Sequence, residues 1–157
     1  MTRHRRPTTV LAATMFASLA ALTACATNAG PVAHVQVQVQ NRLVHAIVVH
    51  LGLIPGSRVR QVQRLQQFIE REVPPGEPVV VAGDFNDWGP QLKRILGGYG
   101  LVEFEAPRAY TYPARLPLAQ LDHVYARGLT PVSLHVPRGR IWWRMSDHLP
   151  LIAEFRL

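Results

Sequence analysis

The sequence has one cysteine and one lysine, and its first part has no acidic residue. Cys25 is the only cysteine, so no disulfide can form within the chain and a disulfide-stapled domain is excluded. Lys93 is the only lysine, and the positive charge comes almost wholly from arginine. No Asp or Glu occurs before Leu43, so that part of the chain offers no carboxylate to a metal ion.

The sequence also lacks an apolar run long enough to cross a bilayer as a helix. The run from Val10 to Ala24 has 15 residues, and it follows a basic start that contains Arg3, Arg5 and Arg6. A basic start and a short apolar run are typical of an export signal. We therefore expect a signal peptide at residues 1–24, a flexible tether at residues 25–33 and a folded domain at residues 34–157.

The end of this run gives the cysteine a possible role. Leu22-Thr-Ala-Cys25 resembles a bacterial lipobox. That resemblance implies cleavage before Cys25, a lipid on its sulfur, and a membrane-anchored lipoprotein of the cell envelope. Ordinary cleavage after Ala26 is the alternative, and it predicts a periplasmic or extracellular protein.

Charge and length set broad limits. The formal net charge is +7, and without the three arginines of the expected signal fourteen basic residues remain against ten acidic ones, or +4. This mild positive balance suits a phosphate-bearing substrate without selecting one. With 157 residues, of which 48% are apolar, the chain can form at most one ordinary domain.

The first folded elements are indicated by periodicity. His34 to Gln40 alternates strictly between apolar and polar residues, which predicts a strand with one apolar face. Asn41-Arg42 fits a two-residue hairpin turn into a more deeply buried strand, Leu43 to His50. Ser57 is the expected N-cap of an amphipathic helix that ends near Val73, with its arginines in water. A nucleic-acid-binding face is the alternative use of those arginines.

The rest of the chain alternates strands with one short helix. We expect a strand buried on both faces, a short helix and then several strands. Their predicted ranges are Val79 to Ala82, Gln91 to Leu96, Leu101 to Glu105, Leu121 to Ala126, Pro131 to Val136 and Leu151 to Leu157. This order predicts an α/β fold with a mixed sheet beneath a long helix.

The stretch from Pro78 to Trp88 is the first candidate for a site. Asp84 and Asn86 follow the buried strand at positions i and i+2, so on an extended backbone their side chains point the same way. Polar residues at the carboxyl end of a buried strand commonly line a site. The alternative is that both residues only form a turn.

Other polar residues occur at the ends of the remaining strands. The full set is His50, Asp84, Asn86, Asp122, Asp147 and His148. Carboxylates of this kind hold Mg²⁺ or activate water, and a histidine oriented by an acid transfers protons, so the set suits phosphate-ester hydrolysis. A zinc site lacks its usual close His/Cys spacing, and no serine occupies a strand-to-helix elbow.

Four of these stretches together resemble a known family. His50-Leu, Gly-Asp84-Phe-Asn86, Leu-Asp122-His and Ser-Asp147-His148 match the order of motifs in the endonuclease/exonuclease/phosphatase superfamily, the deoxyribonuclease I-like proteins. The resemblance runs from about Leu43 to Leu157. It implies part of a four-layer α/β/β/α sandwich, here mainly one mixed sheet with a long covering helix, and corresponds to the second half of the family fold.

The resemblance also implies roles for the site residues. Asp147 would be a ligand of Mg²⁺ or Mn²⁺, together with Asp84, which would also orient the attacking water. Asn86 would contact the scissile phosphate. The remaining catalytic residues would be His148 paired with Asp122, which stabilise the transition state or transfer a proton, and His50, which contacts phosphate oxygens.

Several other residues are assigned less specifically. Trp142, Trp143 and Arg144 precede the last motif and could line the substrate rim, although core packing explains the two tryptophans equally well. Four histidines match no family role, and we expect them to be ordinary surface or partly buried residues: His34, His45, His123 and His135.

The chain departs from the family pattern because the Glu that is a principal metal ligand has no counterpart. We therefore predict a metal-dependent phosphoesterase or phosphodiesterase whose activity is impaired, or is completed by a second copy or by a separate N-terminal half. We also expect an uncovered apolar face on the sheet. A non-catalytic envelope lipoprotein is the alternative function. The substrate, a nucleic acid or a phospholipid head group, stays open.

Overall fold

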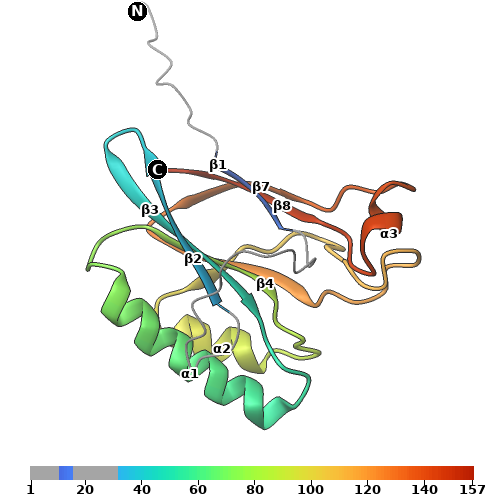
Figure 1. Ribbon diagram of the computed structural model, residues 1–157, viewed down its shortest axis with the longest axis horizontal. Helices are drawn as coiled ribbons and strands as arrows, with labels where there is room; N and C mark the ends of the chain where they lie inside the picture. The colour runs from blue at the N-terminus through green and yellow to red at the C-terminus, as the bar shows by residue number, and fades with distance from the viewer. Residues whose placement is uncertain (1–10, 16–31) are drawn as a thin grey trace, which may run out of the picture.

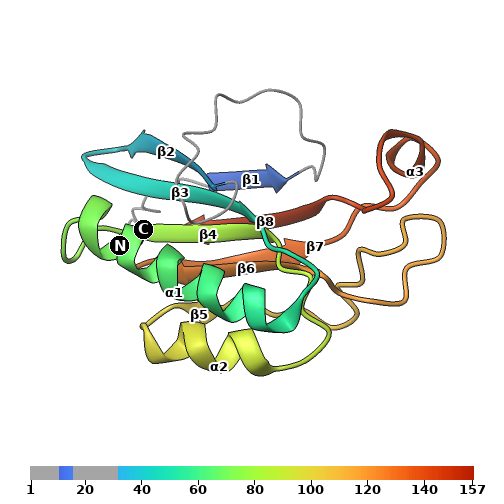
Figure 2. The ribbon, with the colours of Figure 1, turned by 60° about the horizontal axis from the view of Figure 1, so that its bottom comes forward.

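The computed structural model describes residues 11–15 and 32–157 of the chain. In this part, a five-stranded sheet lies between two helices on one face and a three-stranded sheet on the other (Figures 1 and 2). These layers confirm the predicted partial α/β/β/α sandwich, in which one mixed sheet dominates. Most of the expected signal peptide and tether, Cys25 included, lies in residues 1–10 and 16–31, outside the described residues; residues 11–15 and 32–33 of these segments are described.

The five-stranded sheet has the order β2-β3-β4-β6-β5. Only β3 and β4 run parallel among these neighbours, and the other pairs are antiparallel. The strands are β2 Val32–Val39, β3 Arg42–His50, β4 Val79–Asp84, β5 Val102–Glu103 and β6 Asp122–Arg127. Every residue of β4 is buried, as its unbroken apolar run predicts.

The hairpin between β2 and β3 differs from the prediction by one residue. Val39 pairs with Arg42, so the two-residue loop is Gln40-Asn41 and not Asn41-Arg42. Gln40 adopts a left-handed backbone conformation, with φ 54°, which the sequence pattern does not favour at a glutamine. β2 also begins at Val32, two residues before the predicted strand.

The second sheet has the antiparallel order β1-β8-β7. Its strands are β1 Leu11–Met15, β7 Thr130–His135 and β8 Leu151–Arg156. β1 comes from the apolar run that the sequence marks as an export signal, and Leu11 pairs with Phe155 at the start of the register. Export of the chain stays a prediction.

The helices are α1 Pro55–Glu72, α2 Gln91–Gly98 and the short α3 Trp142–Met145. Ser57 is not the N-cap of α1, because the helix begins two residues earlier with Pro55, whose fixed φ suits the first turn. Arg58 is buried, contrary to the expectation that all arginines of this helix lie in water. No helix among the described residues has the length and apolar character needed to span a membrane.

Apolar side chains pack on both faces of the five-stranded sheet. Val79 and Val81 pack under the helices with Leu65, whereas Val80 and Ala82 face the three-stranded sheet. The second sheet therefore covers much of the apolar face that we expected to be open. Part of the expectation holds, since Val35 and Val48 remain 46% and 38% exposed.

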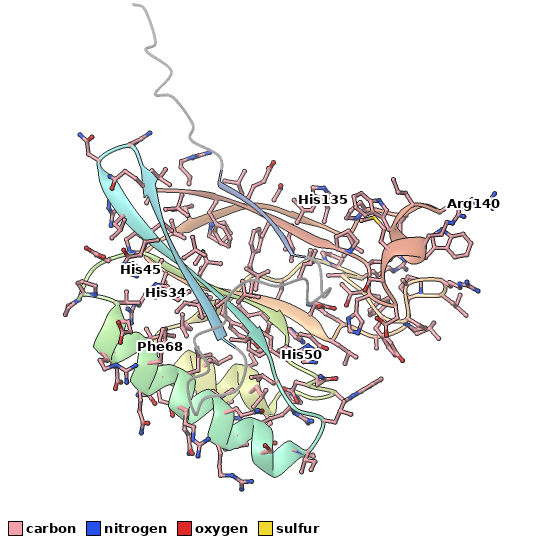
Figure 3. All side chains as sticks on the ribbon, in the orientation of Figure 1. His34, His45, His50, Phe68, His135 and Arg140 are labelled. Atoms are coloured by element: carbon pink, nitrogen blue, oxygen red, sulfur yellow. The ribbon has the colours of Figure 1, made fainter. Side chains whose placement is uncertain are left out.

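His45 on β3 is not the surface or partly buried residue that we expected. It is fully buried, its Nε2 lies 2.5 Å from Oε2 of Glu77, and its Nδ1 lies 2.9 Å from Nε2 of His34. The rings of His34 and of Phe68 on α1 pack in a T-shaped arrangement, with their centres 5.5 Å apart (Figure 3). Both ring nitrogens of His45 are thus used inside the fold.

Candidate active site

The sheet brings three of the predicted residues to one level. In the parallel pair β3/β4, His50 is opposite Asp84, and in the antiparallel pair β4/β6, Asp84 is opposite Asp122. Opposite residues of neighbouring strands project on the same face, so the three side chains form a row across the sheet. The predicted convergence of strand ends is therefore present in the structure.

His148 completes this row from the segment before β8. Its Nδ1 lies 2.7 Å from Oδ2 of Asp122, and its Nε2 lies 4.0 Å from Oδ2 of Asp84. On the other side, Nε2 of His50 lies 3.7 Å from the same Asp84 oxygen. Asp84 thus lies between two imidazoles, and the His50 side chain is 54% exposed, so the row opens to solvent at that end.

The backbone N–H and the side-chain NH₂ group of Asn86 both donate hydrogen bonds within the protein. Its backbone N–H donates to Oδ1 of Asp84 at 2.8 Å, while its side-chain Nδ2 lies 2.8 Å from the Leu51 carbonyl and 3.2 Å from Oδ2 of Asp84. Asn86 has a positive φ of 48°, a conformation that asparagine tolerates better than most residues. The residue therefore orients the Asp84 carboxylate and links it to the end of β3.

Gly83 is required by the close approach of β3 and β4. A Cβ at this position would lie 1.9 Å from the Val49 carbonyl oxygen, and the φ of Gly83 is 143°. Only glycine fits this space and this conformation without strain. The Gly-Asp-Phe-Asn sequence thus has a local physical reason that precedes any chemistry.

The segment that brings in His148 is tied down by its own backbone. Oγ of Ser146 accepts a hydrogen bond from the N–H of His148 at 3.1 Å, and the Asp147 carbonyl accepts one from the N–H of Ala114 at 2.6 Å. The ring of Tyr112 lies 4.9 Å from the ring of His148. The Asp147 side chain is exposed, and its predicted role as a metal ligand stays a prediction.

The charges in the row alter two pKa values. Burial raises the pKa of Asp84, the hydrogen bond from the Asn86 N–H opposes this, and the charge of Asp122 raises the pKa further. Burial alone would lower the pKa of His148, but its hydrogen bond to Asp122 and the charges of Asp122, Asp84 and Asp147 outweigh it, so the net pKa is raised. The site therefore favours a protonated His148 beside a carboxylate that retains a proton more readily than usual.

One pair beside the site was missed by sequence reasoning. Nη1 of Arg58 lies 2.6 Å from the Leu53 carbonyl, and its Nη2 lies 3.9 Å from Oδ1 of Asp87. Oδ2 of Asp87 in turn accepts a hydrogen bond from the N–H of Leu92 at 3.1 Å. This buried pair joins the loops that follow β3 and β4. The position of Asp87 directly after Asn86 was the available signal, but its partner on α1 is set only by the fold.

The three predicted rim residues lie on or beside α3, at the same end of the sheets. Trp142 and Trp143 are both partly buried, and the guanidinium carbon of Arg115 lies 5.6 Å from the centre of a Trp143 ring. Arg144 is exposed. The two tryptophans are therefore neither fully in the core nor fully on the surface, and both predicted roles, core packing and substrate rim, stay open.

Comparison with known proteins agrees with this geometry. A sequence model described as the endonuclease/exonuclease/phosphatase family matches residues 7–148. The chain belongs to this family. Its superfamily consists of phosphoesterases and nucleases, and its members generally use divalent metal ions.

Relatives and solved structures of this family differ widely in what their names state. The uncharacterized protein YbhP of Escherichia coli is 36% identical over 121 residues, which are 74% of this chain and 47% of that protein. The chain thus spans about half the length of this relative.

Humanized D. rerio TDP2 superposes with a TM-score of 0.62 at 19% identity, over 80% of this chain and 60% of that one. A mannosyl-6-phosphatase of Bacteroides thetaiotaomicron superposes with a TM-score of 0.55 at 15% identity, over 74% and 51%. These two structures support the fold alone.

Proposed function

We propose that this chain hydrolyses a phosphate ester by attack of a water molecule at the row formed by His50, Asp84, Asp122 and His148. The observation that carries the proposal is the position of His148 between two carboxylates. Its Nδ1 lies 2.7 Å from Oδ2 of Asp122, and its Nε2 lies 4.0 Å from Oδ2 of Asp84. A histidine held in this way by a carboxylate is suited to proton transfer.

The residues divide the work by their chemistry. Asp84, whose pKa is raised, accepts a proton from the attacking water more readily than a surface carboxylate does. His148, whose pKa is also raised, keeps its proton to higher pH than a free imidazole does, and in that form it neutralises negative charge that grows on the phosphate oxygens. His50 is the most exposed member of the row and contacts a phosphate oxygen. Asn86 keeps the Asp84 carboxylate in place.

The divalent metal of the family is not accommodated by a complete set of ligands here. Among the described residues, no group of three or more His, Cys, Asp or Glu side chains is placed to hold a metal ion. The donor set therefore does not fit the family's ion by itself, and none of the steps above involves a metal. We expect Mg²⁺ or Mn²⁺ to bind weakly, through Asp84 and Asp147 only.

Completion of the site by other residues is part of the proposal. The match with YbhP spans only 47% of that relative, and an added Glu from a second copy or from a separate N-terminal half would strengthen metal binding. The proposed location is the cell envelope, with a lipid anchor at Cys25 or as an exported protein without one. The substrate is a nucleic acid or a phospholipid head group.

The test is a hydrolysis assay on the purified full-length chain with bis(p-nitrophenyl) phosphate, with and without Mg²⁺ or Mn²⁺. We expect slow but measurable hydrolysis, and Asp84→Ala should reduce it by about 10²–10⁴-fold. His135→Ala, which changes an exposed histidine on β7, is the matched control and should keep the rate. A chain with no hydrolysis of diesters or monoesters under any of these conditions would instead support the non-catalytic lipoprotein.

A further inference from the structure

Two long segments beyond the strand ends form one surface next to the active site. Residues 106–120 and 136–146 project at the same end of the molecule, past the ends of β3 and β4 (Figure 2). Backbone hydrogen bonds join the first segment to the residues directly after the second, from the N–H of Ala114 to the Asp147 carbonyl at 2.6 Å and from the N–H of Leu149 to the Thr111 carbonyl at 2.8 Å. The two segments also touch where Arg115 packs over Trp143. We call these two segments the loop face.

The loop face exposes aliphatic side chains near its tips. Leu116 and Leu118 are 65% and 69% exposed, and Ile141 and Met145 are 64% and 54% exposed. Isolated apolar residues on a surface need no explanation, but four exposed ones on two loops that touch each other are more than scattered single residues and often mark a site of contact.

The same surface is strongly positive. Residues 106–120 and 136–146 contain five arginines and no acidic residue. Within residues 33–157, none of these guanidinium groups forms an ion pair with a carboxylate, although Arg115 packs over Trp143. The five are Arg108, Arg115, Arg138, Arg140 and Arg144. Their charge is therefore available to an external anion, and Arg140 points outward from the molecule (Figure 3).

Aliphatic tips among unpaired arginines match an anionic lipid surface better than a nucleic acid. Aliphatic side chains insert at the boundary between head groups and acyl chains, while arginines bind lipid phosphates. Nucleic-acid strands are held instead by stacking of bases on aromatic rings. Three of the four aromatic rings of this face, those of Tyr112, Trp142 and Trp143, are partly buried, and Arg115 covers a Trp143 ring. Only Tyr110 is exposed, at 40%, so the face offers one open ring for stacking against four exposed apolar side chains for insertion.

We propose that the loop face docks the protein on an anionic phospholipid surface. This docking is inferred from the side chains of the loop face alone and does not depend on the proposed hydrolase function. Its use, which is to bring the row at Asp84 to a lipid head-group phosphate, rests on the proposed hydrolase function. This would narrow the substrate to a phosphate ester at a membrane surface.

The test measures binding of the full-length chain, made as Cys25→Ser so that no lipid can be attached, to vesicles of phosphatidylglycerol and phosphatidylcholine. The double variants Leu118→Ser/Ile141→Ser and Arg138→Gln/Arg140→Gln should each weaken cosedimentation by about tenfold or more. Matched controls are Val102→Ser, at 69% exposure on β5, and Arg60→Gln/Arg94→Gln on the two helices, which should bind as the parent does.

A second measurement locates the contact without relying on variants. Hydrogen exchange in the presence of vesicles should slow in residues 106–120 and 136–146. Exchange that slows only elsewhere, or loop variants that bind like the controls, would overturn the inference. Tighter, loop-dependent binding to single-stranded DNA than to vesicles would assign the face to nucleic acid and would overturn it too.

Hydrolysis of the soluble diester separates this inference from the proposed function. A chain that hydrolyses the soluble ester but ignores vesicles contradicts the docking alone. A chain that binds vesicles through the loop face but hydrolyses no ester contradicts the proposed function alone.

Discussion

Strand β3 carries two histidines in different environments, one with a structural role and one at the candidate active site. Near its start, His45 is fully buried and both of its ring nitrogens are bonded, to Glu77 and to His34. At its end, His50 is half exposed and faces Asp84 across 3.7 Å. His50 lies five positions beyond His45, which on an extended strand is about 17 Å. Figure 3 shows His34 and His45 together beside α1 and His50 apart from them.

The difference lies in what each ring nitrogen can still do. A histidine with both nitrogens bonded inside the fold has no position left for a substrate, so His45 stabilises the packing of β2, β3 and the 74–78 loop. His148 has one nitrogen on Asp122 and directs the other toward Asp84 and the open end of the row. A carboxylate partner therefore does not by itself mark a catalytic histidine.

The largest expected effect follows from changing His148. His148→Gln keeps a donor toward Asp122 but removes the titrating ring, so hydrolysis of bis(p-nitrophenyl) phosphate should fall by about 10²–10⁴-fold while the melting temperature changes little. Steady-state rates and thermal melts check this. If the variant melts much earlier and its folded fraction retains full activity, His148 belongs with His45 and the comparison breaks.

His45→Ala should show the opposite pattern. It removes a fully buried ring and leaves the Glu77 and His34 groups without their partner, so the free energy of unfolding should fall by about 2–4 kcal/mol. Urea denaturation measures the loss, and activity per folded molecule should not change. His135→Ala, at an exposed histidine, should stay within about 0.5 kcal/mol of the parent.

Asp122→Asn sharpens the comparison through pH. In the parent, the raised pKa of His148 contributes stability that is present below the unfolded pKa of about 6.5 and is lost as pH rises through the folded pKa. The variant removes the main cause of the raised pKa, so this pH dependence should shrink and the His148 titration in NMR spectra should move to lower pH. An unchanged titration would mean that Asp122 does not control His148.

The smallest expected effect is a gain in stability from Asp84→Asn. Burial raises the pKa of Asp84, so its charge costs stability that appears as pH rises from the unfolded pKa of about 3.9 through the folded pKa. An amide keeps an oxygen for the Asn86 N–H without that cost. The melting temperature at pH 7 should therefore equal or exceed the parent's by a few degrees, although activity is lost. A clearly lower melting temperature would contradict the inference that burial of the Asp84 charge costs stability.

Much of this arrangement could be predicted from local patterns. The alternation after His34 and the apolar run from Val79 to Ala82 identify strands because side-chain direction reverses at every residue. The residues at the strand ends identify the row because neighbouring strands end at the same edge. By contrast, the loop Gln40-Asn41 and the start of α1 at Pro55 depend on pairing and packing that local pattern does not contain.

The amino-acid sequence alone determined the order of elements, the doubly buried central strand, and the types of side chain at its end. These follow from hydrophobic periodicity and from the chemistry of each residue. Only the tertiary structure decided that Asp122 bonds His148, that Asn86 orients Asp84, that Arg58 is buried against Asp87, and that His45 is structural. Each of these is a contact between residues on different segments or a burial that the whole fold creates, and local periodicity holds no information about either.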